Sequence, residues 1–373
     1  MHADEHLIPL FEATFEGRGL ELVDAHTHIG ENDPDGFSCT FEENLAALGL
    51  ANARGVVFAM HEPSGYRDAN DRIRAAAESS GGRLIPFCRL DPHHAGAVEE
   101  GERSLDAGAR GIKLHPRAER FTVADAEDVF ALAHERRVPV LIHAGRGIPA
   151  LGEQALEMAE RFPSAALILA HAGISDLAWM WRRLDDHPNV YFDTSWWNPA
   201  DLLALCALVP PGRVLHGSDL PYGTAVLGAI LTARCALEVG LGDDALASIT
   251  GGQLERLLAG EEGADLGPAP GAEAIDVDPL LDRVHNNLVN ASGRVISGHD
   301  GDEPIALARL ACDVGAGAPQ AEACEQVLEL LHMHELATED MGRDIPVFTD
   351  LHYLVAATCV ARTPKAPLPA ATI

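Results

Sequence analysis

The sequence contains very little lysine. Only Lys113 and Lys365 occur among 27 basic residues, so arginine supplies almost all the positive charge. Against 57 aspartates and glutamates this gives a formal net charge of −30 at pH 7. A surface of that sign repels phosphate backbones, so nucleic acid is not an expected partner. The charge of a substrate stays open, because a local basic pocket can exist within an acidic surface.

Other features are missing as well. No apolar run reaches the roughly 18 residues of a membrane helix, so no membrane partner is expected. The N-terminal stretch has acids but no basic region typical of a secretory leader. The seven cysteines are scattered and never form CxxC, which is typical of reduced thiols. We therefore expect a cytoplasmic protein.

Short apolar runs recur through the first 220 residues, with amphipathic helical patterns between them. Such alternation indicates a parallel sheet covered by helices, and eight units at this spacing predict a (β/α)8 TIM barrel. An open, doubly wound sheet is the alternative, but no strand is followed by a glycine-rich phosphate-binding turn. The runs are residues 20–26, 55–59, 84–88, 111–115, 138–143, 166–171, 189–194 and 213–219.

The composition changes after about residue 260. Residues 263–275 are rich in glycine, proline, alanine and acids, which predicts a linker. The rest of the chain has helical periodicity. We expect a barrel over residues 1–262 and a small all-helical appendage over residues 276–373, which ends in a flexible tail.

Residues of metal-ligand types stand at the ends of several predicted strands, where (β/α)8 barrels hold their chemistry. Singly, each has a structural explanation, such as a hydrogen-bonded core histidine, a helix N-cap or an internal ion pair. Together they predict a metal centre. They are His26 and His28 on the first strand, Lys113 and His115 on the fourth, His143 on the fifth, His171 on the sixth and Asp219 on the eighth.

The spacing of His26 and His28 suits a single ion, because residues two apart on a strand point to the same face. His332 and His334 have the same spacing but lie in a predicted helix. There, two residues are separated by about 200° around the axis, so we expect that pair not to bind a metal.

The motifs DAHTHIG, GIKLHP, VLIHAG, LILAHAG, YFDTS and HGSDLPYG follow one another over about residues 20–260. They resemble motifs of the amidohydrolase superfamily of metal-dependent hydrolases, in particular the branch that includes aminocarboxymuconate-semialdehyde decarboxylase. The resemblance implies that His26, His28 and Asp219 bind a metal. In mononuclear members of that branch the position of His143 adds a ligand, and the position of His171 lies beside the metal-bound water.

Binuclear members of the superfamily use a carbamylated lysine on the fourth strand as a bridge between two ions. Here the resemblance would make Lys113 that bridge, with His143 and His171 on the second ion. Burial in an apolar strand lowers the pKa of a lysine, which favours the neutral amine that carbamylation needs. Lys113 also shares a face with His115 and could instead bind a substrate anion. We favour one ion over two.

The expected cofactor is a divalent cation, most simply Zn²⁺, which lowers the pKa of a bound water toward about 7. Asp219 is the expected proton acceptor, and His171 would orient the water or stabilise the developing oxyanion. Three arginines near one rim suggest an anionic small-molecule substrate. The candidate substrate-binding residues are Arg89, His115, Arg117, Arg146 and Trp196.

Three functions remain open. The first is hydrolysis of a C–N or C–O bond, and the second is non-hydrolytic decarboxylation of an unsaturated or aromatic acid, which the resembling branch performs with the same ligands. The third is a non-catalytic barrel that serves as a scaffold for the appendage, although a scaffold has no need of a converging ligand set. The sequence neither requires nor excludes a homo-oligomer.

Overall fold

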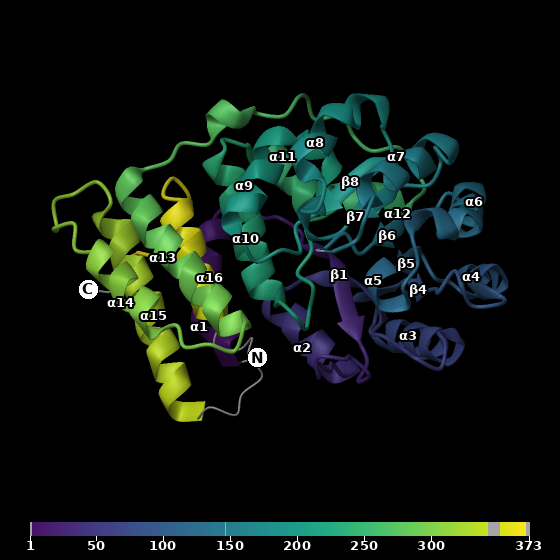
Figure 1. The fold of residues 1–373 in the computed structure, drawn as a ribbon, viewed down its shortest axis with the longest axis horizontal. Helices are drawn as coiled ribbons and strands as arrows, with labels where there is room; N and C mark the ends of the chain where they lie inside the picture. Colours follow the sequence, from purple (N-terminus) through teal and green to yellow (C-terminus); the bar gives the residue numbers. More distant parts are fainter. Residues whose placement is uncertain (1, 146, 342–350, 371–373) are drawn as a thin grey trace.

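The computed structural model describes residues 2–145, 147–341 and 351–370, and it shows a (β/α)8 barrel with a helical region on one side (Figure 1). The strands are β1 (Val23–Ile29), β2 (Arg54–Ala59), β3 (Leu84–Pro86), β4 (Cys88–Arg89), β5 (Ile112–Leu114), β6 (Val140–Ile142), β7 (Leu167–Leu169), β8 (Val190–Asp193) and β9 (Val214–Leu215). The barrel helices are α1 (His2–Phe15), α2 (Phe41–Leu50), α3 (Arg67–Ser79), α4 (Ala97–Asp106), α5 (Pro116–Glu119), α6 (Glu127–Arg136), α7 (Leu151–Arg161), α8 (Leu177–Met180), α9 (Pro199–Leu208), α10 (Ala225–Glu238), α11 (Asp243–Ala247) and α12 (Gln253–Leu258). The helical region contains α13 (Pro279–Ile296), α14 (Asp302–Ala311), α15 (Ala321–Met341) and α16 (Leu351–Arg362).

The strands pair in parallel and close into a barrel, which confirms the predicted fold. They run in the order β1-β2-β3 and then β4 through β9. β3 and β4 share one strand position, interrupted at Phe87, whose amide still donates to the Val57 carbonyl at 2.9 Å. At the closing seam, the amides of Ala25 and His28 donate to the carbonyls of His216 and Leu220, each at 2.8 Å.

The barrel strands are buried on both faces. Every residue of β5, β6, β7 and β8 is buried, because side chains fill the interior and helices cover the outside. This explains why the sequence shows continuous apolar runs and not the alternation of a half-exposed sheet. Polar residues at the ends of these strands therefore stand out in the sequence against the apolar runs.

The carboxyl-terminal helices pack directly on the barrel. Figure 1 shows α13–α16 gathered on the side where α9, α10 and α1 lie, and α16 contacts all three of those helices. Arg234 of α10 is fully buried and donates to Thr363 Oγ1 at 3.0 Å, to the Thr363 carbonyl at 2.9 Å and to the Pro367 carbonyl. This guanidinium caps the carboxyl end of α16, where the helix dipole is negative.

The division into a barrel, a linker and a helical domain stays a prediction. Thr363 and Pro367 belong to the predicted flexible tail, and both contact Arg234 in this structure. All seven cysteines are buried and free of disulfides. Within the described residues, no helix has both the length and the apolar character needed to cross a bilayer.

Sequence analysis did not predict the amino-terminal helix α1, which packs against α10. Its Asp4 accepts a hydrogen bond from Thr224 Oγ1 at 2.5 Å. Thr224 is the N-cap of α10 and also accepts from the Leu227 amide at 3.2 Å. Helix α1 is thereby attached to the start of the helix that follows Asp219.

Candidate metal centre

His26, His28 and Asp219 form a three-ligand group at the closing seam of the barrel. One ligand atom of each lies within 4.8 Å of the others. Asp219 Oδ1 is 3.1 Å from His26 Nε2 and 3.2 Å from His28 Nε2. Two imidazoles and one carboxylate are a donor set typical of Zn²⁺ and similar divalent ions. The residues present therefore fit a divalent cation.

Burial sets the protonation of this group. His26 is 1% exposed and His28 is 4% exposed, and desolvation lowers the pKa of both well below the usual value. Burial thus favours the neutral form of both imidazoles, which is the form that metal binding requires. Desolvation also raises the pKa of Asp219 well above its usual value, with the Lys113 charge opposing this. A divalent cation would reverse that shift, because it favours the carboxylate form.

Lys113 borders the three-ligand group. It lies on β5 with no solvent exposure, and its Nζ is 3.1 Å from His26 Nε2. Burial lowers its pKa to about 7. A neutral amine at this position suits a bridging carbamate, and that role stays a prediction.

His143 and His171 form a second pair next to the group. His171 Nε2 lies 2.8 Å from His143 Nδ1, and His171 Nδ1 lies 2.8 Å from the Ser195 carbonyl oxygen. His115 stacks on the His143 ring, with centroids 3.9 Å and planes 12° apart. The structure therefore brings together three of the four ligands expected for a single ion, while His143 contacts His171 instead.

Two of these residues have a strained backbone. The φ angles of His171 and Asp219 are 58° and 60°. Such left-handed conformations of non-glycine residues cost about 1–3 kcal/mol and persist only where the surroundings impose them. Both residues lie at the centre, where strain is commonly tied to function.

Sequence reasoning missed two buried carboxylates that support the centre. Asp193 Oδ2 lies 2.8 Å from His26 Nδ1. Asp24 Oδ1 accepts from the backbone amides of His26 at 2.9 Å and Ser218 at 3.0 Å. Both residues are fully buried. A signal was present, since Asp193 also ends an apolar run and Asp24 directly precedes AHTH.

The candidate substrate-binding residues are in different situations. Arg89 is 2% exposed, and its guanidinium donates to Glu119 Oε1 at 2.6 Å and to the Ala59 carbonyl at 3.1 Å. Arg117 is exposed on α5, directly after Pro116, the residue that follows His115. Arg146 lies outside the described residues. The substrate-binding roles of these arginines stay predictions. The positive charge of Arg89 is already balanced by the carboxylate of Glu119.

Aromatic rings contact two histidines of the centre. Trp196 lies edge-on to His171, with centroids 6.3 Å apart. Tyr222 lies edge-on to His28, with ring centroids 5.4 Å apart, and its ring centroid is 4.8 Å from that of Phe37. The three aromatic side chains come from the loops after β8, β9 and β1, so they adjoin the carboxyl-end rim.

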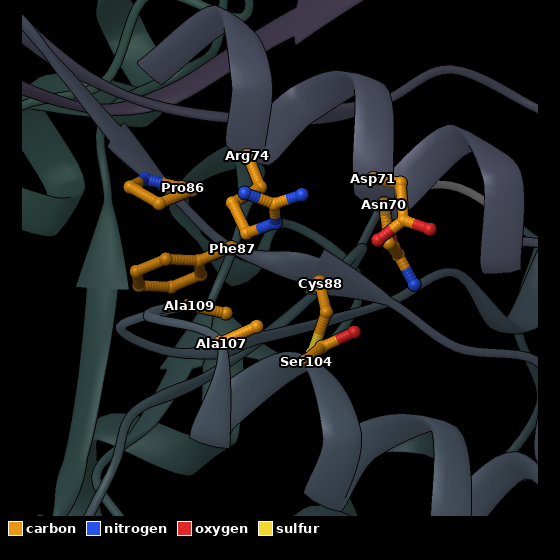
Figure 2. A pocket seen from close by; sticks show the side chains of 9 residues that line it. All are labelled: Asn70, Asp71, Arg74, Pro86, Phe87, Cys88, Ser104, Ala107 and Ala109. Carbon is orange, nitrogen blue, oxygen red and sulfur yellow. The ribbon is translucent and has the colours of Figure 1, made fainter. Parts of the chain in front are cut away.

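A separate crevice lies at α3 and α4 (Figure 2). Its lining includes Cys88 and the charged residues Asp71 and Arg74. Asp71 is already paired with Arg103 at 2.8 Å, and Arg74 with Glu78 at 2.6 Å. With its charges paired, we interpret this crevice as a gap in helix packing.

A family model described as amidohydrolase matches residues 23–252, which is more than half of the chain. The chain belongs to this family. The match begins at β1 and includes every residue of the centre, whereas α13–α16 lie beyond it. The amidohydrolase superfamily consists of metal-dependent enzymes, in agreement with the ligand set of this amidohydrolase. A comparison with curated proteins found no match.

Solved structures with the same fold include three informative examples. An uncharacterised TIM-barrel protein from Bordetella bronchiseptica is 18% identical with a TM-score of 0.51, over 65% of this chain and 99% of its own. The 5-carboxyvanillate decarboxylase from Sphingomonas paucimobilis is 15% identical with a TM-score of 0.50, over 65% and 99%. A dihydroxybenzoic acid decarboxylase from Polaromonas sp. JS666, with bound manganese, is 15% identical with a TM-score of 0.52, over 64% and 97%. At these identities the likeness establishes the fold alone.

Proposed function

We propose that this amidohydrolase hydrolyses a C–N or C–O bond of a small, anionic substrate with one divalent ion held by His26, His28 and Asp219. The observation that carries the proposal is the convergence of these three ligands, with His171 next to them. When bound, the ion supplies Lewis acidity and lowers the pKa of a water. The anionic character of the substrate is supported by Arg117 on α5, whose positive charge acts on the His143 ring.

Asp219 is assigned as the proton acceptor. Its side chain is 21% exposed, against 1% for His26 and 5% for His28, so it is the ligand that a substrate and water can reach. Its Oδ2 faces His171 Nδ1 at 3.9 Å. The Ser195 carbonyl holds the His171 ring in place at 2.8 Å. We assign His171 to orient the attacking water or to stabilise the developing oxyanion.

The number and kind of ions are part of the proposal. We favour one zinc ion at the three-ligand group. A second ion would use Lys113, His143 and His171, and the 2.8 Å contact between the two histidines supports that alternative. The manganese in the Polaromonas decarboxylase makes Mn²⁺ the first metal to compare with zinc.

Decarboxylation of an unsaturated or aromatic acid is the second candidate. The rings of Trp196 and Tyr222, which contact His171 and His28, favour it, because aromatic side chains next to the centre can pack against a planar substrate ring. Of the three solved structures named above, two are decarboxylases of aromatic acids.

Metal content and product analysis test the proposal. We expect about one equivalent of divalent metal in the purified protein, and loss of activity on chelation that is restored by Zn²⁺ or Mn²⁺. His28→Ala should lose the metal, while His332→Ala, which alters a histidine 62% exposed on α15, should keep it. A panel of amides, lactones and aromatic acids, assayed for hydrolysis and for CO₂, separates the two reactions. A protein that neither carries nor binds metal would refute both and leave the scaffold hypothesis.

A further inference from the structure

Asp193, the last residue of β8, is fully buried beside the three-ligand group, and both of its oxygens are used. Oδ2 lies 2.8 Å from His26 Nδ1. Oδ1 accepts from the backbone amides of His171 at 2.9 Å and Ser195 at 3.0 Å, and from the Ser195 hydroxyl at 2.5 Å. One carboxylate thus contacts His26 within β1 and two residues, His171 and Ser195, that follow β7 and β8.

These contacts determine the tautomer of His26. A carboxylate only accepts hydrogen bonds, so His26 Nδ1 must carry the hydrogen. The Ser195 hydroxyl is also 3.1 Å from Nδ1, but its own hydrogen is directed at Asp193 Oδ1. His26 Nε2 is then left with a lone pair on the side of Asp219 Oδ1 and Lys113 Nζ, each 3.1 Å away. That lone pair is the atom a metal would bind.

The same carboxylate supports the strained backbone of His171. At a φ of 58°, the conformation of His171 must be imposed by its surroundings. Its amide is fixed by Asp193 Oδ1, and its ring by the Ser195 carbonyl. Asp193 therefore acts on the ring of one functional histidine and on the main chain of another.

We propose that Asp193 is a positioning residue, which fixes the metal-binding tautomer of His26 and the main-chain conformation that presents His171. The inference rests on the proposed metal function. His28 provides an internal comparison, because its Nδ1 has no hydrogen-bond partner among the described residues. The His28 ring contacts a carboxylate only through Nε2, which lies 3.2 Å from Asp219 Oδ1. Among the described residues, His26 is therefore the histidine of the HxH pair whose Nδ1 faces a carboxylate.

Asp193→Asn is the decisive variant. The amide oxygen must take the place of Oδ1, because the His171 and Ser195 backbone amides facing that atom cannot become acceptors. The NH₂ group then faces His26 Nδ1 and donates to it. This moves the ring hydrogen to Nε2 and removes the lone pair from the metal side, as replacing the buried aspartate of a serine-protease triad with asparagine does.

Asp24→Asn is the matched control. Asp24 is equally buried and also contacts His26, but through the backbone amide at 2.9 Å. Its other oxygen, Oδ2, has no hydrogen-bond partner among the described residues. The control makes the same carboxyl-to-amide change beside His26 and leaves the ring partner intact, so the difference between the two variants isolates the tautomer.

The readouts are Zn²⁺ affinity by competition with a chelator and the ring ¹H–¹⁵N correlations of His26 in the metal-free protein, assigned with His26→Gln. We expect Nδ1–H in the wild type and Nε2–H in Asp193→Asn. The Asn variant should bind Zn²⁺ about 10–100-fold more weakly than Asp24→Asn, the usual effect of losing a hydrogen-bond partner of a ligand histidine.

Two outcomes overturn the inference. One is a wild-type His26 with its hydrogen on Nε2, a measurement that does not depend on any variant folding except the one used for assignment. The other is a folded Asp193→Asn protein with the flipped tautomer and the Zn²⁺ affinity of the control. Failure of the wild type to bind any metal would refute the proposed function instead. The tautomer of His26 in the metal-free protein would still show whether Asp193 positions that ring.

Discussion

At the scale of single residues, two identical spacings have different outcomes. His26 and His28 both join the three-ligand group, as expected for residues two apart on a strand. His332 and His334 on α15 diverge, since the His332 side chain is 62% exposed and His334 is 8% exposed. The expectation that the helical pair would not share a face is confirmed. Backbone periodicity, and not the histidine pair itself, determines whether a site forms.

The Arg89–Glu119 pair gives a prediction at this scale. Both side chains are almost fully buried, at 2% and 3% exposure. Glu119→Ala should lower the free energy of unfolding by about 3–5 kcal/mol, because it leaves a buried guanidinium without its carboxylate. Urea denaturation measures this change.

Two further variants test whether the unpaired charge of Arg89 causes the loss of stability in Glu119→Ala. The double variant Arg89→Met/Glu119→Leu should recover most of the loss, because no charge is then left buried. Arg74→Ala breaks a more exposed pair with Glu78 and should cost less than about 1 kcal/mol. A double variant as unstable as Glu119→Ala would show that packing, and not charge, explains the loss.

At the scale of elements, the strands match the sequence prediction more closely than the helices do. Each predicted apolar run contains or overlaps a strand of the barrel. The run at residues 84–88 is divided into β3 and β4 around Phe87. Helix α1 was missed, because its sequence HADEHLIPLFEATF includes Pro9, which disfavours a helix interior. Its attachment to α10 through Asp4 and Thr224 is a tertiary contact that no local pattern shows.

Helix α16 gives a prediction of pH dependence. His352 is 7% exposed, neither ring nitrogen has a hydrogen-bond partner among the described residues, and burial lowers its pKa from 6.5 to about 4. The unfolded chain therefore binds a proton more readily than the folded one as the pH falls below 6.5. The contribution of the neutral His352 to the free energy of unfolding is fully present above pH 6.5. It is lost as the pH falls toward 4, and the whole loss is about 3 kcal/mol.

His352→Leu removes this titration. Between pH 7 and pH 5, the free energy of unfolding of the wild type should fall by about 2 kcal/mol more than that of the variant. Urea denaturation at the two pH values measures the difference. Equal pH dependence in the two proteins would show that His352 is accessible to protons in the folded state.

At the scale of the whole molecule, the barrel and the helical region share one hydrophobic core. Buried residues of α16, such as Leu354 and Val360, belong to the same cluster as Ile230 and Leu231 of α10. Residues 351–361 of α16 are all buried. The helical region lies outside the family match, yet it covers barrel surface that would otherwise be exposed.

We therefore predict that the barrel does not fold by itself. A chain that ends at residue 275 exposes the apolar faces of α10 and α1, and should aggregate or lack a cooperative thermal transition. The full chain should unfold in a single calorimetric transition. Co-expression of residues 276–373 should restore soluble protein. A stable, cooperative fragment would instead support the predicted division into independent domains.

The sequence by itself determined the fold class and identified the candidate metal-ligand residues at the strand ends. Its signals are local, since buried parallel strands are continuous apolar runs and strand ends carry the polar groups. His26, His28 and Asp219 could be picked out because each interrupts or follows such a run.

Only the tertiary structure decided how these residues meet. His143 contacts His171, which is 28 positions away in the sequence. Glu119 neutralises Arg89 from 30 positions away, and Asp193 faces His26 from 167 positions away. Such contacts depend on the register of the strands and the path of the loops, which no local pattern encodes. The strand pattern of the sequence shows where the candidate ligands lie. The residues that hold them in place are brought to them only when the barrel closes.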